Sequence, residues 1–308
     1  MDKIGKYEIL EELLSTGFSD IYVAKNPDTE GLVAIKIFHP KGNNTGEKAK
    51  YGDAFWRARF LEESRLLAQF DHPNIVKAID ADETLAGDPY FVMPFMEANL
   101  FYEIGEDAET PEAIAELPPK WRPRPISPRR ATEIWYQVLD ALSVLHKSGL
   151  VHRDIKPPNV LLDTKTRGSV KLCDFGMVKV PDSQGSRPGV WLGTLEYISP
   201  EQRKSATDVD VRSDVYSAGV LMYRMLSGRL PTDRRAPMRA GRFDIPEGLV
   251  MLIEDCLKKK RSERPQDAGE VLMRLKLCVP DISALADTSK ILSRSRHPIS
   301  ISAIKRKQ

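Results

Sequence analysis

Apolar and polar side chains alternate along the first part of the chain, and this alternation predicts strands over residues 7–25 and 32–38. Between residues 55 and 70 the period becomes helical, with Trp56, Phe60, Glu63, Leu67 and Phe70 on one face. An apolar run at residues 89–96 predicts a buried strand that leads into a connector. The first hundred residues therefore favour a sheet with one main helix.

Helical patterns dominate the rest of the chain. Ser127 and Pro128 are typical of an N-cap and first turn, and Gly149 suits the C-cap of the amphipathic helix that follows. A buried helix is predicted to open within residues 208–220. The dense prolines of residues 101–127 exclude a long helix. We expect a short helix at 99–104 and then an extended insertion, for which a solvated loop is favoured over a docking surface.

Two short segments carry the candidate chemistry. Asp154, Lys156 and Asn159 lie within residues 151–159, and Asp174 follows twenty residues after Asp154. The apolar runs 159–162 and 170–172 flank a turn at 165–168, which predicts a hairpin that holds both carboxylates at one rim. Paired carboxylates with a nearby lysine and amide suit metal-assisted transfer of a highly charged group.

These segments resemble the catalytic loop and the Asp-Phe-Gly metal site of the eukaryotic-type (Hanks-type) Ser/Thr protein kinases, and in particular their bacterial branch. The resemblance implies an α+β, bilobal protein kinase fold, with a small β-rich N-lobe that carries one main helix and a larger helical C-lobe. It implies a kinase domain at 1–279, with an N-lobe at 1–95, a hinge at 94–98, a C-lobe at 99–279 and an insertion at about 101–127. Residues 280–308 are expected to form a basic, serine-containing flexible tail.

The resemblance assigns roles to individual residues. Asp154 resembles the acid that accepts the substrate hydroxyl proton, and Lys156 the lysine that neutralises the phosphate in transfer. Asn159 and Asp174 resemble the two magnesium ligands. Lys36, at the end of Val33-Ala34-Ile35-Lys36, resembles the lysine that binds the α- and β-phosphates of ATP. Its expected carboxylate partner is Glu63, which lies on the apolar face of its helix, whereas Glu62 is the solvated alternative.

The expected nucleotide pocket begins with a glycine-poor phosphate loop. Leu14, Thr16 and Ser19 stand where the family has three glycines, and only Gly17 is a glycine. Side chains at those places should stiffen the loop and hold backbone N–H groups farther from phosphate. The predicted pocket residues are Leu14, Ser15, Thr16, Gly17, Phe18, Ser19, Ile21, Ala34, Lys36, Met93, Pro94, Met96 and Leu161.

Three further groups of residues follow from the resemblance. Thr194 is expected to bond Asp154 and Lys156 beside the acceptor peptide, and the segment around it is typical of Ser/Thr rather than Tyr kinases. Arg153 often binds a phosphate on the activation loop, for which Ser183 and Ser186 are the candidate sites; a short loop that is ordered without phosphate is the alternative. Asp214 is expected to anchor the catalytic loop, and Glu201 to pair with Arg264.

Composition narrows the class of protein. The 308 residues carry a net charge of only +2, so overall charge gives no reason to expect nucleic-acid binding. Three widely spaced cysteines indicate a reducing compartment, and no apolar run is long enough for a membrane span. We expect a cytoplasmic enzyme that uses ATP and Mg²⁺, with Mn²⁺ as the alternative metal, and acts on protein substrates and on itself. The sequence leaves the oligomeric state open.

Two other functions stay open from the sequence. The altered phosphate loop motivates a nucleotide-binding pseudokinase scaffold with little or no transfer activity. The presence of Lys36, Glu63, Asp154, Asn159 and Asp174 weighs against it. A kinase-fold phosphotransferase acting on small molecules is the second alternative, and the Ser199-Pro200-Glu201 segment with its peptide platform weighs against it.

Overall fold

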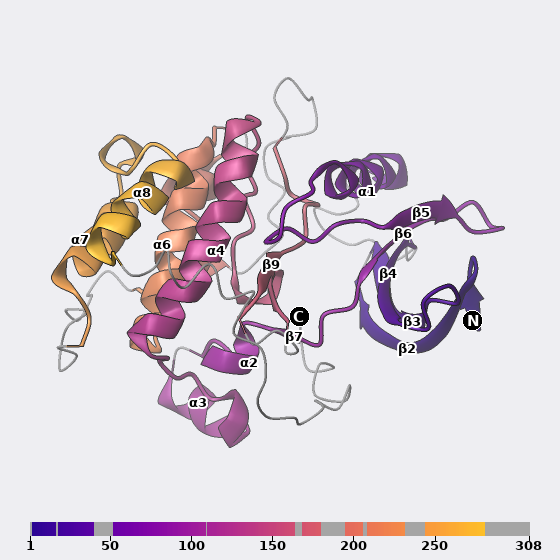
Figure 1. The fold of residues 1–308 in the computed structure, drawn as a ribbon, viewed down its shortest axis with the longest axis horizontal. Coiled ribbons are helices and arrows are strands. Elements are labelled where there is room, and N and C mark those ends of the chain that lie inside the picture. The colour runs from indigo at the N-terminus through magenta and orange to yellow at the C-terminus, as the bar shows by residue number, and fades with distance from the viewer. Residues whose placement is uncertain are drawn as a thin grey trace. The chain divides into compact units, whose positions relative to one another are not determined.

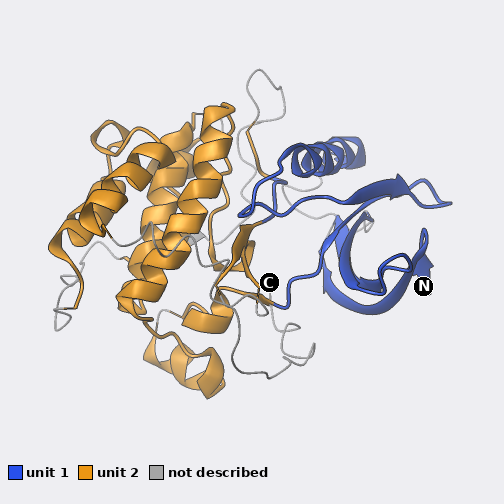
Figure 2. Ribbon diagram, viewed as in Figure 1, with its two compact units in different colours: residues 1–97, 173–176, 295–308 blue, residues 98–172, 177–294 orange. Residues whose placement is uncertain are grey.

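A computed structural model describes residues 2–16, 18–39, 52–108, 110–163, 168–179, 195–205, 208–231 and 244–280. The chain forms two compact units (Figure 2). The first unit contains residues 1–97 and 173–176, and the second contains residues 98–172 and 177–294.

A curled sheet makes up most of the first unit (Figure 1). Its six strands run in the order β1-β2-β3-β4-β6-β5, and every neighbouring pair is antiparallel. The strands are β1 (Lys3–Ile4), β2 (Tyr7–Ser15), β3 (Ser19–Lys25), β4 (Leu32–Phe38), β5 (Asp80–Glu83) and β6 (Pro89–Pro94). Within the described residues of this unit, the one long helix is α1 (Gly52–Gln69). The strands predicted at 7–25 and 32–38 and the helix predicted at 55–70 are confirmed.

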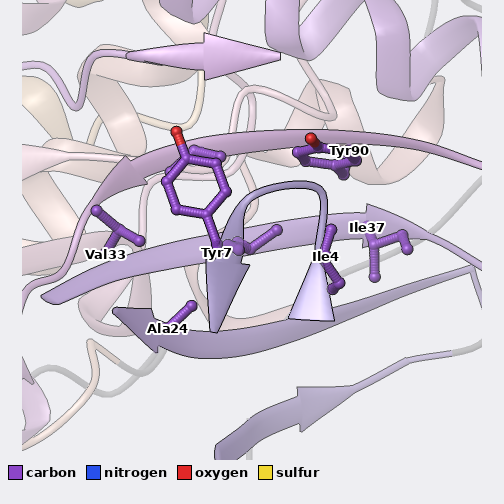
Figure 3. Close-up of a cluster of buried hydrophobic side chains, with 8 residues drawn as sticks. Ile4, Tyr7, Ala24, Val33, Ile37 and Tyr90 are labelled. Carbon is purple, nitrogen blue, oxygen red and sulfur yellow. The ribbon is translucent and has the colours of Figure 1, made fainter. Parts of the chain in front are cut away.

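Alternation along β4 divides its side chains between two faces of the sheet. Val33, Ile35 and Ile37 are at most 5% exposed and belong to a cluster with Tyr7 and Tyr90, which Figure 3 shows. Burial of side chains of this size stabilises the fold by about 1.5–3 kcal/mol each. Because neighbours in a strand point to opposite faces, Ala34 and Lys36 are directed away from this cluster.

Helices form most of the second unit, in which α4 packs against α6 and α8, and α6 against α7. The indole N–H of Trp135 on α4 donates to the carbonyl of Ala218 on α6 at 2.9 Å, so the two longest helices are also joined by a buried hydrogen bond. The helices are α2 (Phe101–Ile104), α3 (Pro111–Glu116), α4 (Pro128–Lys147), α5 (Pro200–Lys204), α6 (Val211–Ser227), α7 (Glu247–Cys256) and α8 (Ala268–Cys278). Short 3-10 helices are η2 (Pro119–Trp121), η3 (Pro157–Asn159), η4 (Leu195–Tyr197) and η5 (Arg261–Glu263).

The second sheet is small and holds the predicted hairpin. It has the order β7-β8-β9, with β7 (Ala98–Asn99), β8 (Val160–Leu162) and β9 (Val170–Leu172). The hairpin expected from the apolar runs at 159–162 and 170–172 is confirmed by the antiparallel register of β8 and β9. The residues that join its strands at 164–167 lie outside the described part of the chain.

The insertion at residues 101–127 differs from its prediction. The short helix α2 is present, but the extended conformation expected after it is wrong at residues 111–116, which form α3. The Thr110 hydroxyl accepts the N–H of Ala113, and Pro111 occupies the first helical position, where a missing N–H costs nothing. Prolines therefore limit the helix to six residues without excluding it.

Candidate active site

Lys36, Glu63 and Asp174 meet in the first unit. The Lys36 ammonium donates to both carboxylate oxygens of Glu63 at 2.8 Å and lies 3.7 Å from a carboxylate oxygen of Asp174. The Lys36 side chain is 14% exposed and that of Glu63 is 4% exposed. Burial by itself lowers the pKa of Lys36, but the two carboxylates more than offset it and raise the pKa above its ordinary value, so the ammonium stays charged.

Local structure explains why Glu63 rather than Glu62 is the partner. Glu63 lies on the buried face of α1 with Trp56, Phe60 and Leu67. Glu62, one residue earlier, points to the other side and pairs with Arg65, at a place where both side chains are substantially exposed. The helical period in the sequence therefore already separates the two carboxylates, and the structure brings Lys36 to the one that is buried.

Asp174 is held in an uncommon backbone conformation. Its φ angle is +62°, in the left-handed region that a non-glycine residue adopts only when its surroundings stabilise it. Two residues later, the carbonyl of Gly176 accepts hydrogen bonds from the Nε and an Nη of Arg59 on α1, at 3.2 and 2.5 Å. Phe175 between them is 1% exposed and its ring lies 6.3 Å from that of Phe70. The two residues that follow Asp174 are thus held by contacts with α1 and Phe70.

Arg59 is a site residue that our sequence analysis did not identify. It precedes Glu63 by four residues and therefore lies on the same side of α1. The signal in the sequence that could have identified Arg59 is its position one helical turn before Glu63, a carboxylate predicted to be buried. Burial lowers the pKa of Arg59, with the opposing effect of Glu63 second in size.

The phosphate loop hydrogen-bonds to itself. The Thr16 hydroxyl accepts the backbone N–H of Ser19 at 3.0 Å and that of Phe18 at 3.3 Å, and donates to the Ser19 carbonyl at 2.8 Å. The Phe18 ring stacks on Trp56 of α1, with 4.3 Å between ring centroids. The loop is therefore tied both to itself and to the helix that carries Glu63.

The strand register aligns the other predicted pocket residues of the first unit. Leu14 on β2 is opposite Ile21 on β3, and Ile21 is opposite Lys36 on β4. Ala34 is opposite Met93 on β6. Because directly paired residues point to the same face, these side chains lie on the Lys36 face of the sheet.

The remaining pocket residues are more scattered. Ser15 donates its hydroxyl to Asp20 at 2.6 Å, which holds it at the end of the β2–β3 pairing. Pro94 is exposed at the end of β6, and Met96 is partly buried in the connector. Leu161 lies on β8 of the second unit and is partly buried. Gly17, Ser183, Ser186 and Thr194 lie outside the described residues.

A catalytic loop with the expected residues lies in the second unit. Asp154 is 8% exposed, and one of its carboxylate oxygens lies 2.9 Å from the Lys156 ammonium. The amide nitrogen of Asn159 donates to the same oxygen and to the Asp154 carbonyl, both at 2.8 Å. This arrangement orients the Asp154 carboxylate and directs the Asn159 nitrogen inward, so the amide oxygen is the atom left to meet a hard cation.

Asp214, at the start of α6, holds the backbone of the catalytic loop. It is fully buried and accepts the backbone N–H groups of His152 at 2.7 Å and Arg153 at 2.8 Å. Arg153 has a φ of +68°, a conformation that these bonds help to maintain. Its carbonyl accepts the Gln202 side-chain amide at 2.8 Å, and its own Nε donates to the Met177 carbonyl at 2.5 Å.

His146 also contributes to this support, and its two hydrogen bonds define its tautomer. Its Nδ1 accepts the backbone N–H of Ala268 at 3.1 Å, so its Nε2 carries the proton and donates to Asp214 at 3.0 Å. Burial alone would raise the pKa of Asp214. The hydrogen bond from His146, with that of the Arg153 N–H, outweighs burial and holds the pKa below its ordinary value.

The expected pair of Glu201 and Arg264 is also present in the second unit. Two nitrogens of Arg264 donate to the two Glu201 oxygens at 2.7 and 2.8 Å, and the Ser213 hydroxyl adds a third bond to Glu201 at 2.8 Å. Arg264 also donates to backbone carbonyls of the 258–259 turn and of Arg212. The pair thus joins α5, α6 and the segment before α8.

The candidate metal ligands are oxygen atoms, which suit a hard divalent cation such as Mg²⁺ or Mn²⁺. Asp174 is 39% exposed at its side chain, which leaves its oxygens accessible. No group of three or more histidine, cysteine or acidic side chains in the described part of the chain is placed to hold a metal. Such an ion is typically bound by one or two protein oxygens together with substrate phosphates and water, and Asp174 in the first unit and Asn159 in the second unit each offer such an oxygen.

Comparisons with known proteins agree over most of the chain. Residues 7–275 match the family described as "Protein kinase domain". Serine/threonine-protein kinase pkn2 of Myxococcus xanthus is 35% identical over 289 residues, which cover 87% of this chain and 32% of the relative. The probable serine/threonine-protein kinase PknB of Bifidobacterium longum is 33% identical over 239 residues, which cover 74% of this chain and 31% of the relative. The chain therefore spans about a third of the length of these curated relatives.

A solved structure is similar in fold. The kinase domain of PknI from Mycobacterium tuberculosis superposes with a TM-score of 0.60 at 22% identity, over 89% of this chain and 95% of the PknI chain.

Proposed function

The chain belongs to the protein kinase family and has the protein kinase fold, and from that premise we propose that it transfers the γ-phosphate of ATP to serine and threonine hydroxyls of proteins. The observation that carries the proposal is the Lys36–Glu63 pair within 3.7 Å of Asp174. A buried, permanently charged ammonium beside a partly exposed carboxylate is the arrangement that phosphate and a divalent cation require.

The residues of the first unit bind the nucleotide in this proposal. Lys36, held by Glu63, binds the α- and β-phosphates. Asp174, with Asn159 of the second unit, holds Mg²⁺, which neutralises phosphate charge when bound; Mn²⁺ is the alternative metal. The adenine pocket takes Leu14, Ile21, Ala34, Met93, Pro94, Met96 and Leu161, and the phosphate loop takes residues 15–19.

The residues of the second unit perform the transfer. The acceptor oxygen bonds to the γ-phosphorus, the bond from that phosphorus to the ADP oxygen breaks, and Asp154 takes the hydroxyl proton. Lys156 neutralises charge on the phosphoryl oxygens during transfer. The bonds from Lys156 and Asn159 fix the Asp154 carboxylate before the acceptor arrives, which lowers the cost of orienting it.

Further assignments belong to the same proposal. The kinase domain covers residues 1–279, with lobes at 1–95 and 99–279 and a hinge at 94–98. The basic tail expected at 280–308 lies, apart from residue 280, outside the described residues. Thr194 contacts the acceptor site, Ser183 and Ser186 are phosphorylation sites, and the enzyme acts in the cytoplasm. The names of the bacterial relatives support a Ser/Thr acceptor. None of the described helices has the length and hydropathy to cross a membrane.

The phosphate loop motivates the alternative of a pseudokinase scaffold, which the kinase names of the relatives do not favour. The N–H groups of Phe18 and Ser19, which a phosphate would otherwise take as donors, are already bonded to the Thr16 hydroxyl. A scaffold would bind Mg-ATP, weakly or well, without transferring phosphate.

Labelled ATP distinguishes the two functions. The wild-type chain, Asp174→Ala and Asp154→Asn are incubated with ATP labelled at the γ-phosphate, Mg²⁺ and dephosphorylated casein, and modified residues are then mapped. We expect label on serine or threonine in the wild type and at least a hundredfold less in both variants, given the roughly 10²–10³-fold effects of single electrostatic groups. Binding of Mg-ATP by the wild type without any transfer would establish the scaffold instead.

A further inference from the structure

A fully buried arginine joins the insertion to helix α6. Arg224, near the end of α6, is 1% exposed, and its Nε donates to a carboxylate oxygen of Asp107 at 2.6 Å. One of its Nη atoms donates to three successive carbonyls, those of Ile104, Gly105 and Glu106, at 3.2, 3.0 and 3.2 Å. A buried guanidinium is costly unless it is paired, so residues 104–107 supply what Arg224 requires.

Gly105 allows the insertion to present these carbonyls. Its φ is +75°, and a Cβ at this position would lie 2.1 Å from the Arg122 carbonyl oxygen. The backbone N–H of Glu106 donates to the Trp121 carbonyl at 2.8 Å, and that of Arg124 donates to the Ile104 carbonyl at 2.8 Å. The two ends of the insertion are therefore bonded to each other, and the first end is bonded to Arg224 as well. Residues 104–108 and 110–124 form a docked structure here, where the sequence favoured a solvated loop.

Asp107 also bonds to Tyr197. The Tyr197 hydroxyl donates to the second carboxylate oxygen of Asp107 at 2.9 Å, and Tyr197 is 2% exposed. Its carbonyl accepts the Ser217 hydroxyl of α6 at 2.8 Å. Tyr197 is thus held at both ends, by the insertion at its hydroxyl and by α6 at its backbone.

The residues around Tyr197 follow the proposed acceptor-contacting residue Thr194 in sequence and are linked by a hydrogen bond to the catalytic loop. Tyr197 ends η4, three residues after Thr194, and Ser199 begins the next helix by accepting the N–H of Gln202. Gln202 in turn donates to the carbonyl of Arg153 in the catalytic loop. A displacement of Tyr197 would therefore move residues 198–202, which are hydrogen-bonded to Arg153 through Gln202.

The network has a feature that argues against a purely stabilising role. The other Nη atom of Arg224 finds no hydrogen-bond partner within the described residues. Replacing a partly satisfied buried ion pair by well-packed apolar residues commonly leaves stability unchanged or increased. A network of this kind is better explained by the geometry that it imposes.

We propose that Asp107 is a positioning residue for the protein acceptor: through Tyr197 it places residues 195–198, so that the insertion sets the affinity for acceptor proteins and leaves ATP binding alone. The inference rests on the proposed kinase function. It assigns to this insertion the role of a support for acceptor binding.

The test compares acceptor and nucleotide kinetics. In Asp107→Asn and in Tyr197→Phe, we expect the KM for dephosphorylated casein to rise about tenfold or more, since hydrogen bonds to charged groups are worth tenfold or more in binding. The KM for ATP should stay within twofold. Asp107→Glu should restore part of the loss. The double variant Asp107→Asn/Tyr197→Phe should have a casein KM no higher than that of Asp107→Asn, because both substitutions act on the same Tyr197–Asp107 hydrogen bond.

Glu103→Gln is the matched control. Glu103, on α2, pairs with Arg130 at 2.7 Å, and the two side chains are 24% and 22% exposed, but neither bonds to Tyr197. This variant loses an ion pair of the same region and should keep the casein KM of the wild type. Parallel changes in the KM values for casein and ATP, equal effects of Glu103→Gln and Asp107→Asn, or no change in any variant would overturn the proposal.

Amide hydrogen exchange separates this inference from the kinase function. If the wild type transfers no phosphate, the function proposed above fails, but residues 195–205 should still exchange faster in Asp107→Asn than in the wild type or in Glu103→Gln. Unchanged exchange of residues 195–205 in Asp107→Asn would refute the positioning role whatever the activity.

Discussion

One hydroxyl group, that of Thr16, sets the hydrogen bonding of the glycine-poor phosphate loop. In place of a glycine, Thr16 supplies an oxygen that accepts two backbone N–H groups of its own loop. Glycine loops leave such N–H groups free to approach phosphate closely. Thr16 therefore gives two N–H groups a partner inside the loop, where a glycine would leave them available to a phosphate.

We expect Thr16→Val to bind Mg-ATP more tightly than the wild type. Valine keeps the branched shape and removes the acceptor, so the N–H groups of Phe18 and Ser19 become available to phosphate. With about 0.5–1.5 kcal/mol per hydrogen bond, the Kd should fall roughly threefold to tenfold. Titration calorimetry with Mg-ATP measures it.

Thr29→Val is the control for this change. The Thr29 hydroxyl accepts the N–H of Gly31 at 3.3 Å in the turn between β3 and β4, away from the phosphate loop, and its removal should leave the Kd as it is. A Kd that is unchanged or higher in Thr16→Val would show that the Thr16 hydroxyl does not compete with phosphate.

Helix α1 acts as a single element that holds two groups of the site. Glu63 holds Lys36, and Arg59, one turn earlier, holds the Gly176 carbonyl two residues after Asp174. Because a helix keeps residues four apart at a fixed separation, α1 ties the lysine to Asp174, the aspartate that we propose binds the metal. The stack of Trp56 on Phe18 adds the phosphate loop to the same helix.

We expect Arg59→Met to raise the Mg²⁺ concentration needed for half-maximal activity about tenfold at saturating ATP. Methionine fills much of the same space but cannot donate to Gly176, so Asp174 loses part of its orientation. The measurement is initial rate against free Mg²⁺.

Arg65→Met provides the comparison on the same helix. Arg65 pairs with Glu62, and its side chain is 55% exposed, so it should be dispensable. The same Mg²⁺ dependence in Arg59→Met and Arg65→Met would rule out the role given to Arg59.

At the scale of the whole molecule, the buried carboxylate of Asp214 and the partly buried one of Glu201 link the stability of the second unit to pH. Burial alone would raise the pKa of Glu201, but the hydrogen bonds from Arg264 and Ser213 outweigh it and hold the pKa below its ordinary 4.5. The pKa of Asp214 lies below its ordinary 3.8 because of His146 and backbone N–H groups. A carboxyl group with a lowered folded pKa stabilises the fold fully above its ordinary pKa, and this contribution disappears as the pH falls through the folded pKa.

We therefore expect the free energy of unfolding to be constant from neutral pH to about pH 5 as far as these two groups are concerned, and to decrease below that. Urea titrations followed by circular dichroism, at neutral pH and at several pH values between about 5 and 3, measure the slope. Glu201→Gln should be less stable at neutral pH and show a shallower loss in acid. An equally steep loss in wild type and variant would mean that Glu201 does not contribute.

Local pattern determined much of this protein. The alternation in β4 separates Lys36 from the core residues on either side of it, and the helical period of α1 distinguishes Glu63 from Glu62. Motif spacing identified the catalytic loop, the Asp-Phe-Gly segment, and Asp214 as the anchor of the loop. These features depend on residues that are close in sequence or on a strong family resemblance, so the sequence was sufficient.

Only the tertiary structure decided which distant groups meet. That Arg59 bonds to Gly176, 117 residues away, and that Arg224 bonds to Asp107, again 117 residues away, follows from packing and not from any local period. The insertion looked like a solvated loop because its prolines and charges are typical of one. Its Asp107 pairs with Arg224, on a helix far along the chain, and only the folded chain brings that partner near.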